Sequence, residues 1–281
     1  MSTAWRLLIT PPAMGRRNMA IDEAILDSVA AAMAPPTLRF YAWDPACLSL
    51  GHAQPMDVVD DAGLVVEGWD IVRRPTGGRA LLHTDELTYS IAAPDSVPGL
   101  AGGVLPSYRT LSRGLLAGLE RLGLHPDAPA LTVVGQSDRL NPVCFEVPSA
   151  YEITVGGKKL VGSAQLRRRS AILQHGSLPL TGDITRVVRG LRYPDEDSRR
   201  QAAVRLRRHA TTLEVQLGRP VSFDAAAGAL VEGFVEALGW SITPGPLTSN
   251  EQSMARQLEA TLYRQVALAP AAPEPDAGRS A

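Results

Sequence analysis

The order in which strand-like and helix-like segments follow one another constrains the fold of this chain most strongly. Segments with the compact or alternating apolar pattern of a strand outnumber those with the roughly 3.6-residue period of an amphipathic helix. The two kinds alternate irregularly, without the repeating β–α–β unit of a doubly wound sheet, which favours an α+β (mixed α/β) fold. Strands are predicted at 5–10, 37–43, 70–73, 80–83, 86–92, 151–155, 159–164 and 171–180, and helices at 18–29, 106–122 and 222–238.

The ends of the predicted helices carry recognisable signals. Asn18 is expected to cap the first helix, with Asp22 and Glu23 favourably placed in its first turn. Pro106 is typical of the first turn of the second helix, and Gly123 is typical of its end.

Composition excludes several functional classes. The chain has 281 residues, of which 45% are hydrophobic and 20% charged, and its net charge is -1, as in ordinary globular proteins and unlike disordered chains or polycationic nucleic-acid binders. No apolar run approaches the roughly 18 residues of a membrane span, and the N-terminus lacks the pattern of a secretory signal. We therefore expect a cytoplasmic protein that binds neither nucleic acid nor membranes, with one domain at 1–265 and a disordered Ala/Pro-rich tail at 266–281.

Lysine is nearly missing from the chain. Of its 28 basic residues only Lys158 and Lys159 are lysines. Lysine can lose its proton in a desolvated site, whereas arginine stays charged, so the adjacent pair indicates a site that arginine cannot serve. A codon bias that left two lysines by chance would give the same count.

A basic loop with paired glycines lies at 73–80, between two predicted strands. Gly77 and Gly78 allow close backbone approach, and their amides, together with Arg74, could hold a phosphate, a carboxylate or an acyl carbonyl. A plain turn with solvated arginines has the same pattern. His83, on the strand that follows, is by itself more typical of a structural histidine than of a catalytic one.

The two cysteines are expected to differ, and no disulfide is expected between them. Cys47 enters an apolar run and is interpreted as buried and inert, whereas Cys144 lies in a proline-bracketed loop where a thiol is accessible. A cysteine with a pKa of about 8.5 needs a neighbouring charge or base to act as a nucleophile. Lys159 could return beside that loop, favour the thiolate and shuttle a proton. An idle thiol and a surface lysine are the simpler alternative. Neither histidine nor cysteine spacing indicates a metal site.

The segment from Arg186 to Arg208 contains eight arginines against the acids at 195–197. Such a stretch suits an acidic protein partner or a phosphate-bearing carrier. A solvated helix face has the same composition.

Two long motifs add a family resemblance. The segments RRPTGGRALLHTDELTYS and YEITVGGKKLVGSAQLRRRSAILQHGSLPL, with NMAIDEAIL and FYAWDPACLSLGHAQ before them, resemble the biotin/lipoate protein ligase-like catalytic domain over about 5–239. The resemblance implies a central mixed sheet flanked by helices, with a pocket between the glycine loop and the lysine strand. CFEVPSAYE is similar to the motif of a cysteine-dependent octanoyltransferase subgroup, whereas TGGRA lacks the third glycine of many ligases.

This resemblance implies roles for single residues. It implies that octanoyl passes from octanoyl-acyl carrier protein to Cys144 as a thioester, and then to a lysine of a lipoyl domain such as glycine-cleavage H protein or a 2-oxoacid dehydrogenase E2. Lys159 would lower the pKa of the cysteine and position the acyl carbonyl. Neither cofactor nor metal is implied, and a monomer is expected. The implied substrate-binding residues are Arg74, Gly77, Gly78 and His83 of the loop and its strand, and Gly162, Ser163 and Ala164 beyond the lysine.

Two other functions remain open at this point. An ATP-dependent lipoate–protein ligase would need ATP and magnesium and would work without Cys144. A non-catalytic module that binds lipoyl domains would never become acylated.

Overall fold

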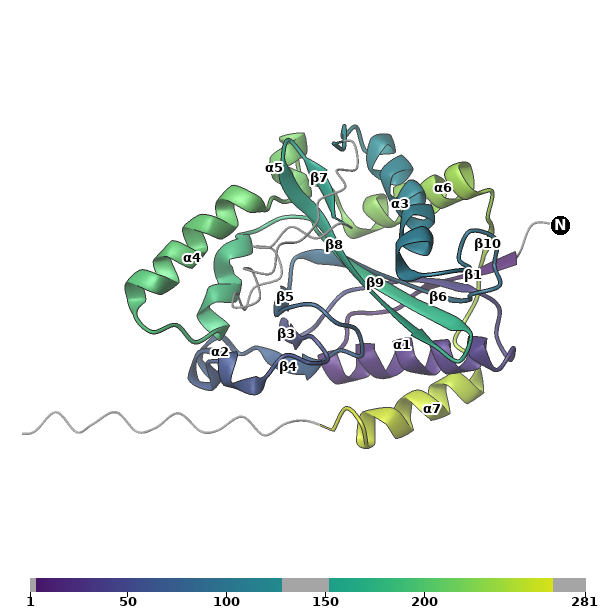
Figure 1. The fold of residues 1–281 in the computed structure, drawn as a ribbon, viewed down its shortest axis with the longest axis horizontal. Helices are drawn as coiled ribbons and strands as arrows, with labels where there is room; N and C mark the ends of the chain where they lie inside the picture. Colours follow the sequence, from purple (N-terminus) through teal and green to yellow (C-terminus); the bar gives the residue numbers. More distant parts are fainter. Residues whose placement is uncertain (1–3, 128–151, 265–281) are drawn as a thin grey trace, which may run out of the picture.

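The computed structural model describes residues 4–127 and 152–264, and its centre is a seven-stranded mixed sheet (Figure 1). The strand order is β10-β1-β2-β6-β9-β8-β7, in which β1 is parallel to both β10 and β2 and all other neighbours are antiparallel. The expected fold class is confirmed. The strands are β1 (Ala4–Ile9), β2 (Thr37–Tyr41), β6 (Glu86–Pro94), β7 (Ile153–Val155), β8 (Lys158–Arg168), β9 (Ala171–Pro179) and β10 (Ser241–Pro244).

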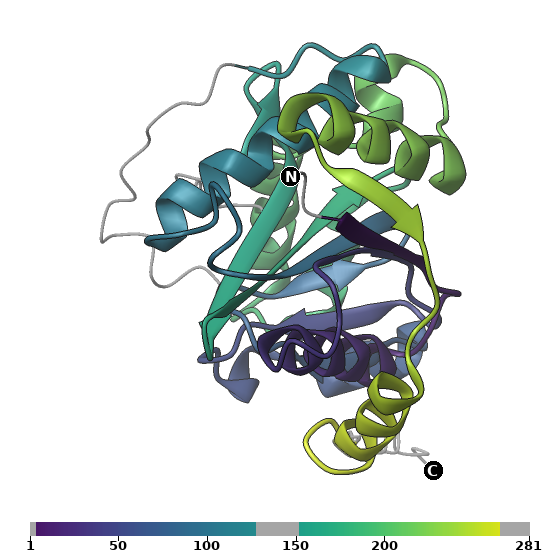
Figure 2. The same cartoon turned by 90° about the vertical axis from the view of Figure 1, so that its right-hand side faces the viewer.

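Helices cover both faces of this sheet (Figures 1 and 2). Leu111 and Phe234, from the helices on one face, belong to a buried cluster with sheet residues such as Phe40. Met19, on the opposite face, belongs to a second cluster with Tyr41. The first face carries α3 (Val104–Arg121) and α6 (Phe223–Leu238), and the other carries α1 (Gly15–Ala30) and α7 (Ser249–Ala260).

A smaller sheet of order β4-β3-β5 lies beside the first. Its strands β3 (Cys47–Leu50), β4 (Asp70–Arg73) and β5 (Leu81–His83) share a third apolar cluster with short helical segments. Those segments are the 3-10 turns η1 (Met56–Val58) and η4 (Ile184–Gly190) and the helices α2 (Asp61–Glu67) and α4 (Glu196–His209); α5 (Leu213–Leu217) follows α4. This sheet holds the glycine loop between β4 and β5 against the main sheet.

The predicted start of the first helix is wrong. Helix α1 begins at Gly15, whose amide donates to the Asp70 carboxylate at 2.9 Å, and Asn18 lies within it. The side-chain amide of the buried Asn18 instead donates to the carbonyls of Ala13 and Ala42. Asp22 and Glu23 are therefore buried mid-helix residues and not first-turn acids. Local capping rules failed because the competing partners are distant in sequence.

The observed ends of other elements differ less from the predicted ones. Helix α3 begins at Val104, so Pro106 lies within its first turn, and β8 continues to Arg168. Helix α6 spans Phe223–Leu238, close to the predicted 222–238; the Ser222 side chain caps it by accepting from the Ala225 amide, and the helix is followed by Gly239 with φ 64°. Helices α2, α4, α5 and α7 and strands β3 and β10 were not among the predicted elements.

Cys47 is fully buried, and burial followed by the nearby Asp70 charge raises the pKa of its thiol well above the usual value. The prediction that Cys47 is buried is confirmed. Within the described residues, no helix has the length and apolar character needed to cross a membrane. The division into a domain at 1–265 and a tail stays a prediction, because 265–281 lies outside the described residues.

Glycines bring α3 and α6 into close contact. A Cβ added at Gly233 would lie 2.2 Å from the Gly118 amide nitrogen, whereas one at Gly228, on the same helix, would meet nothing within 4 Å. We expect Gly233→Ala to lower the free energy of unfolding by about 1–3 kcal/mol through overpacking. Gly228→Ala should leave it unchanged or raise it by up to about 1 kcal/mol through helix propensity. Urea unfolding measures both, and equal effects of the two substitutions would contradict this account.

Candidate active site

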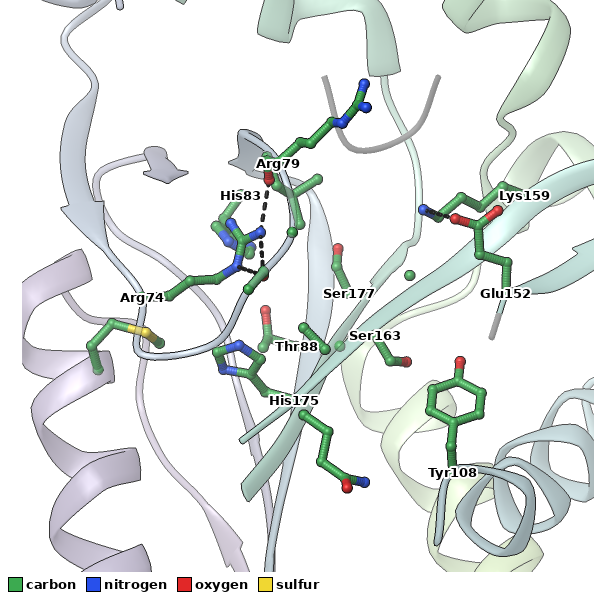
Figure 3. Close-up of a pocket in the computed structure, with 18 of the residues that line it drawn as sticks. Arg74, Arg79, His83, Thr88, Tyr108, Glu152, Lys159, Ser163, His175 and Ser177 are labelled. Atoms are coloured by element: carbon green, nitrogen blue, oxygen red, sulfur yellow. Dashed lines mark hydrogen bonds and ion pairs between the residues drawn. The ribbon is translucent and has the colours of Figure 1, made fainter. Parts of the chain in front are cut away.

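A cavity of about 380 Å³ lies between the glycine loop, the main sheet and α3 (Figure 3). Its volume is within the range of about 300–1,000 Å³ typical of small-ligand sites. Every predicted site residue that the structure describes lines this cavity. These are Arg74, Gly77, Gly78 and His83 on one side and Lys159, Gly162, Ser163 and Ala164 on the other. Cys144 lies outside the described residues.

Arg74 shapes the glycine loop from within. Its guanidinium donates to the carbonyls of Gly77 and Arg79 at 3.0 and 2.8 Å and to the Ser49 hydroxyl at 3.0 Å, and the residue is only 5% exposed. The loop approaches β3 so closely that a Cβ on Gly51 would lie 1.9 Å from the Gly78 carbonyl oxygen. Gly78 has φ 98°, a conformation that favours glycine. Arg74 thus holds the loop in shape by binding its carbonyls.

Lys159 faces the loop from across the cavity (Figure 3). Its Nζ lies 2.5 Å from Oε1 of Glu152, and both side chains are nearly buried. The Lys159 carbonyl accepts from the Thr211 amide at 3.0 Å, which fixes the strand at this point. A charge-assisted pair of this length holds the lysine as an ammonium in the resting site. Glu152 was not predicted as a site residue, although it is the last residue of the CFEVPSAYE motif.

His83 is locked by three neighbours. Its ring stacks on Trp43 at 4.0 Å, Nδ1 lies 2.7 Å from Glu86 Oε1, and Nε2 lies 2.8 Å from the Ser49 hydroxyl. The same hydroxyl accepts from Arg74, so it links the guanidinium to the imidazole. His83 therefore forms a fixed wall of the cavity.

Glu86 is the carboxylate on which this network ends, and it also was not predicted. It accepts from Ser177 and from Thr88, and Thr88 in turn accepts from the Trp43 indole at 2.7 Å. Four residues that line the cavity are oriented by this one buried carboxylate: Trp43, His83, Thr88 and Ser177.

His175 connects the glycine loop to α1. Its Nε2 lies 2.6 Å from the Thr76 hydroxyl and its Nδ1 lies 3.7 Å from the Asp22 carboxylate. Burial lowers the pKa of His175, and Asp22 opposes this only in part, so the ring is neutral at neutral pH. The Asp22 carboxylate accepts hydrogen bonds from the Arg39 guanidinium at 2.6 Å and from the Tyr41 hydroxyl at 2.8 Å.

The remaining wall is made mostly of small and apolar groups. Ser163 lies 2.6 Å from the Tyr89 hydroxyl, and burial raises the pKa of Tyr89 to about 12, so that hydroxyl stays neutral. A Cβ on Gly176 would lie 2.5 Å from the Tyr89 ring and 2.7 Å from Ser163 Oγ. Small residues therefore keep this part of the cavity open, and the Lys159–Glu152 pair lies at its edge.

The arrangement suits acyl chemistry on a lipophilic substrate. An apolar chamber can bind the chain, and a buried ammonium can stabilise a thiolate or a developing oxyanion. In the described ranges, 4–127 and 152–264, no three histidine, cysteine or acidic side chains are grouped so as to hold a metal ion.

The fold and this site define a class, the enzymes that attach lipoyl-type groups to proteins. The fold is similar to a bipartite lipoate protein ligase from Thermoplasma acidophilum, described together with its E2 lipoyl domain, at a TM-score of 0.76 and 26% identity over 92% of this chain and 93% of that one. It is also similar to a lipoate-protein ligase A bound with ATP, at a TM-score of 0.73 and 26% identity over 93% and 95% of the two chains.

The chain belongs to the lipoyl protein ligase A/B catalytic domain family, whose model matches residues 15–235. Two relatives with the name octanoyltransferase LipM are similar over nearly their whole length. The one from Symbiobacterium thermophilum is 45% identical over 94% of this chain and 97% of its own, and the one from Kyrpidia tusciae is 44% identical over 91% and 95%. The expected family and the expected class, an acyltransferase acting in lipoate biosynthesis, are confirmed.

Proposed function

We propose that this protein moves an octanoyl group from octanoyl-acyl carrier protein to a lipoyl-domain lysine through a thioester on Cys144. The main support for this proposal is the Lys159–Glu152 pair, because it places a buried ammonium at the edge of an apolar cavity of the size of an octanoyl chain. The relatives' octanoyltransferase name supports the acyl group, and the lipoyl domain solved with the Thermoplasma ligase supports the acceptor.

The first step makes an acyl-enzyme. The Cys144 thiolate attacks the thioester carbonyl carbon, a C–S bond to the enzyme forms, and the bond to the carrier's sulfur breaks. The proton that Cys144 lost ends on the released carrier thiol. Lys159, held by Glu152, stabilises the thiolate by its charge. The octanoyl chain lies in the cavity, against the small residues 162–164.

The second step transfers the group to nitrogen. The neutral amine of the acceptor lysine attacks the octanoyl-enzyme, a C–N bond forms, and Cys144 leaves as a thiolate. Lys159 gives its proton to the sulfur and takes the one that the nitrogen must lose, so the enzyme returns to its starting state. Because a thioester is already activated, the cycle consumes no ATP and needs no metal.

The intact mass of the protein tests this function. After incubation with octanoyl-acyl carrier protein and without ATP, the wild type should gain one hydroxylamine-labile octanoyl group, and Cys144→Ser should gain none. Adding a lipoyl domain, with glycine-cleavage H protein and an E2 domain compared, should remove the group from the enzyme and place it on the acceptor.

Two other results would contradict the proposal. If ATP with octanoate or lipoate modifies the acceptor even in Cys144→Ser, the protein is a ligase. If the acceptor binds yet no octanoyl group ever appears on either protein, the protein is a binding module.

A further inference from the structure

The structure divides the arginine-rich stretch at 186–208 into two unlike parts. Its first part is neutralised by acids of the chain itself. Arg189 pairs with Glu67, and Arg200, on α4, pairs with Asp197. The other pairs of this part are Arg186 with Asp85, Arg192 with Asp61, and Arg199 with both Glu196 and Asp60.

The last turn of α4 differs. Arg207 and Arg208 are exposed there, and the carbonyl of Arg207 accepts from Nζ of Lys158 at 3.0 Å. The Arg207 guanidinium pairs with the Asp183 carboxylate at 3.4 Å, and both side chains remain largely exposed. We call Lys158, Arg207 and Arg208 the basic edge. Among residues 4–127 and 152–264, it carries three positive charges and one ion-paired carboxylate, that of Asp183.

The basic edge lies next to the cavity lysine. Ala210 forms a parallel bridge with Lys159, and its neighbour Thr211 donates to the Lys159 carbonyl. Arg208 is two residues before that bridge. With 3.8 Å per Cα step and about 4.8 Å between paired strands, the Cα atoms of Arg208 and Lys159 are within roughly 13 Å.

We propose that the acyl donor, an acidic carrier protein bearing its octanoyl group on a phosphopantetheine arm, docks on the basic edge. This inference rests on the proposed function. The donor brings acidic side chains and a phosphodiester to the cavity, and the basic edge attracts both. The acceptor brings a lysine, whose ammonium the same edge repels. Charge therefore favours the donor as the occupant.

A purely structural role for these arginines makes a different prediction. Basic residues in the last turn of a helix interact favourably with its dipole. Their loss would then lower stability without changing recognition of the carrier. The rate of the first acylation separates the two roles.

The test is single-turnover acylation of Cys144, followed by intact mass, at several concentrations of octanoyl-acyl carrier protein. For Lys158→Glu/Arg208→Glu we expect kcat/KM with the carrier to fall on the order of tenfold at low ionic strength. For Arg208→Gln, kcat/KM with the carrier should fall less. Added salt should reduce the difference in kcat/KM between the wild type and each of these variants. Arg200→Glu is the control for the Arg208→Glu change taken alone: it makes that single charge reversal on the same helix, about 12 Å further along its axis, and should behave like the wild type, whereas Arg208→Glu alone should lower kcat/KM.

A small thioester donor, octanoyl-N-acetylcysteamine, completes the design. It has neither acidic protein nor phosphate, so all variants should accept it at the wild-type rate. An equal loss with this donor, a loss only in the transfer to the lipoyl domain, or no loss with the carrier would each overturn the docking proposal. A wild type that the carrier never acylates would overturn the proposed function itself, and this inference with it.

Discussion

Replacing Lys159 by arginine should leave the first acylation of Cys144 measurable while slowing transfer to the acceptor lysine by about 10²–10⁴-fold. Arginine keeps the positive charge beside the thiolate and can still pair with Glu152, but it cannot release a proton at physiological pH. Lys159→Ala should lose both steps, because the charge disappears as well. Rapid quenching followed by intact mass measures the octanoyl-enzyme and the octanoylated acceptor separately.

The accumulation of octanoyl-enzyme is the diagnostic signature of Lys159→Arg. A variant that was merely misfolded would form little acyl-enzyme, and thermal unfolding would reveal it. If Lys159→Arg transferred octanoyl to the acceptor at the wild-type rate, the lysine's proton would have no part in the reaction and only its charge would matter.

Asp22→Asn should lower the free energy of unfolding by about 3–5 kcal/mol, the usual cost of breaking a buried ion pair. The Arg39 guanidinium, which lies 2.6 Å from Asp22, would remain fully buried with its partner's charge removed. Asp27→Asn is the control on the same helix, because Asp27 pairs with Arg168 at a more exposed position and should cost less than about 1 kcal/mol. Urea unfolding at neutral pH measures the difference.

The effect of Asp22→Asn should depend on pH. Burial alone would raise the pKa of Asp22, but Arg39, His175 and Ser90 together hold it below its usual value. The stability that this carboxylate contributes is therefore complete above the unfolded pKa of about 3.9 and is lost as the pH falls through the lower folded pKa. The gap between wild type and variant should narrow in that acidic window. A gap that stayed constant as the pH fell would contradict the ion-pair explanation.

The fold by itself does not separate a ligase from a transferase. Both solved structures compared above are lipoate-protein ligases, yet the similar sequences from Symbiobacterium and Kyrpidia are octanoyltransferases. One scaffold can therefore host more than one way of activating an acyl group. Under the proposed function the difference depends on Cys144, which is why its substitution is the decisive experiment.

Elements with strong local signals were predicted well. Helix α6 matches its predicted range closely, and so do strands β2, β4, β6 and β9. Helix α4 was expected only as a possible solvated face, because its sequence buries just Ala202 and Leu206. Nothing in so polar a pattern indicates which arginines find acids on neighbouring elements.

The site residues that belong to local sequence motifs were predicted. The glycine loop and the lysine strand stand out in the sequence, and the structure places both on one cavity. His175 was missed because its partner Thr76 is 99 residues away. Glu86 has two partners close in sequence, His83 and Thr88, but its third, Ser177, is 91 residues away, and only the folded sheet brings all three to one carboxylate. Glu152 was missed although its motif was recognised, because only the folded hairpin brings it to Lys159.

The sequence alone determined the elements whose stability is local, the unusual lysine pair and, through its motifs, the family. The tertiary structure decided which polar groups became buried partners, and so which carboxylates hold Lys159, His83 and Arg39 in place. The physical reason is that periodicity and capping depend on neighbours within a few residues. Desolvation and ion pairing depend on distance in space, which is set only when strands remote in the chain come together.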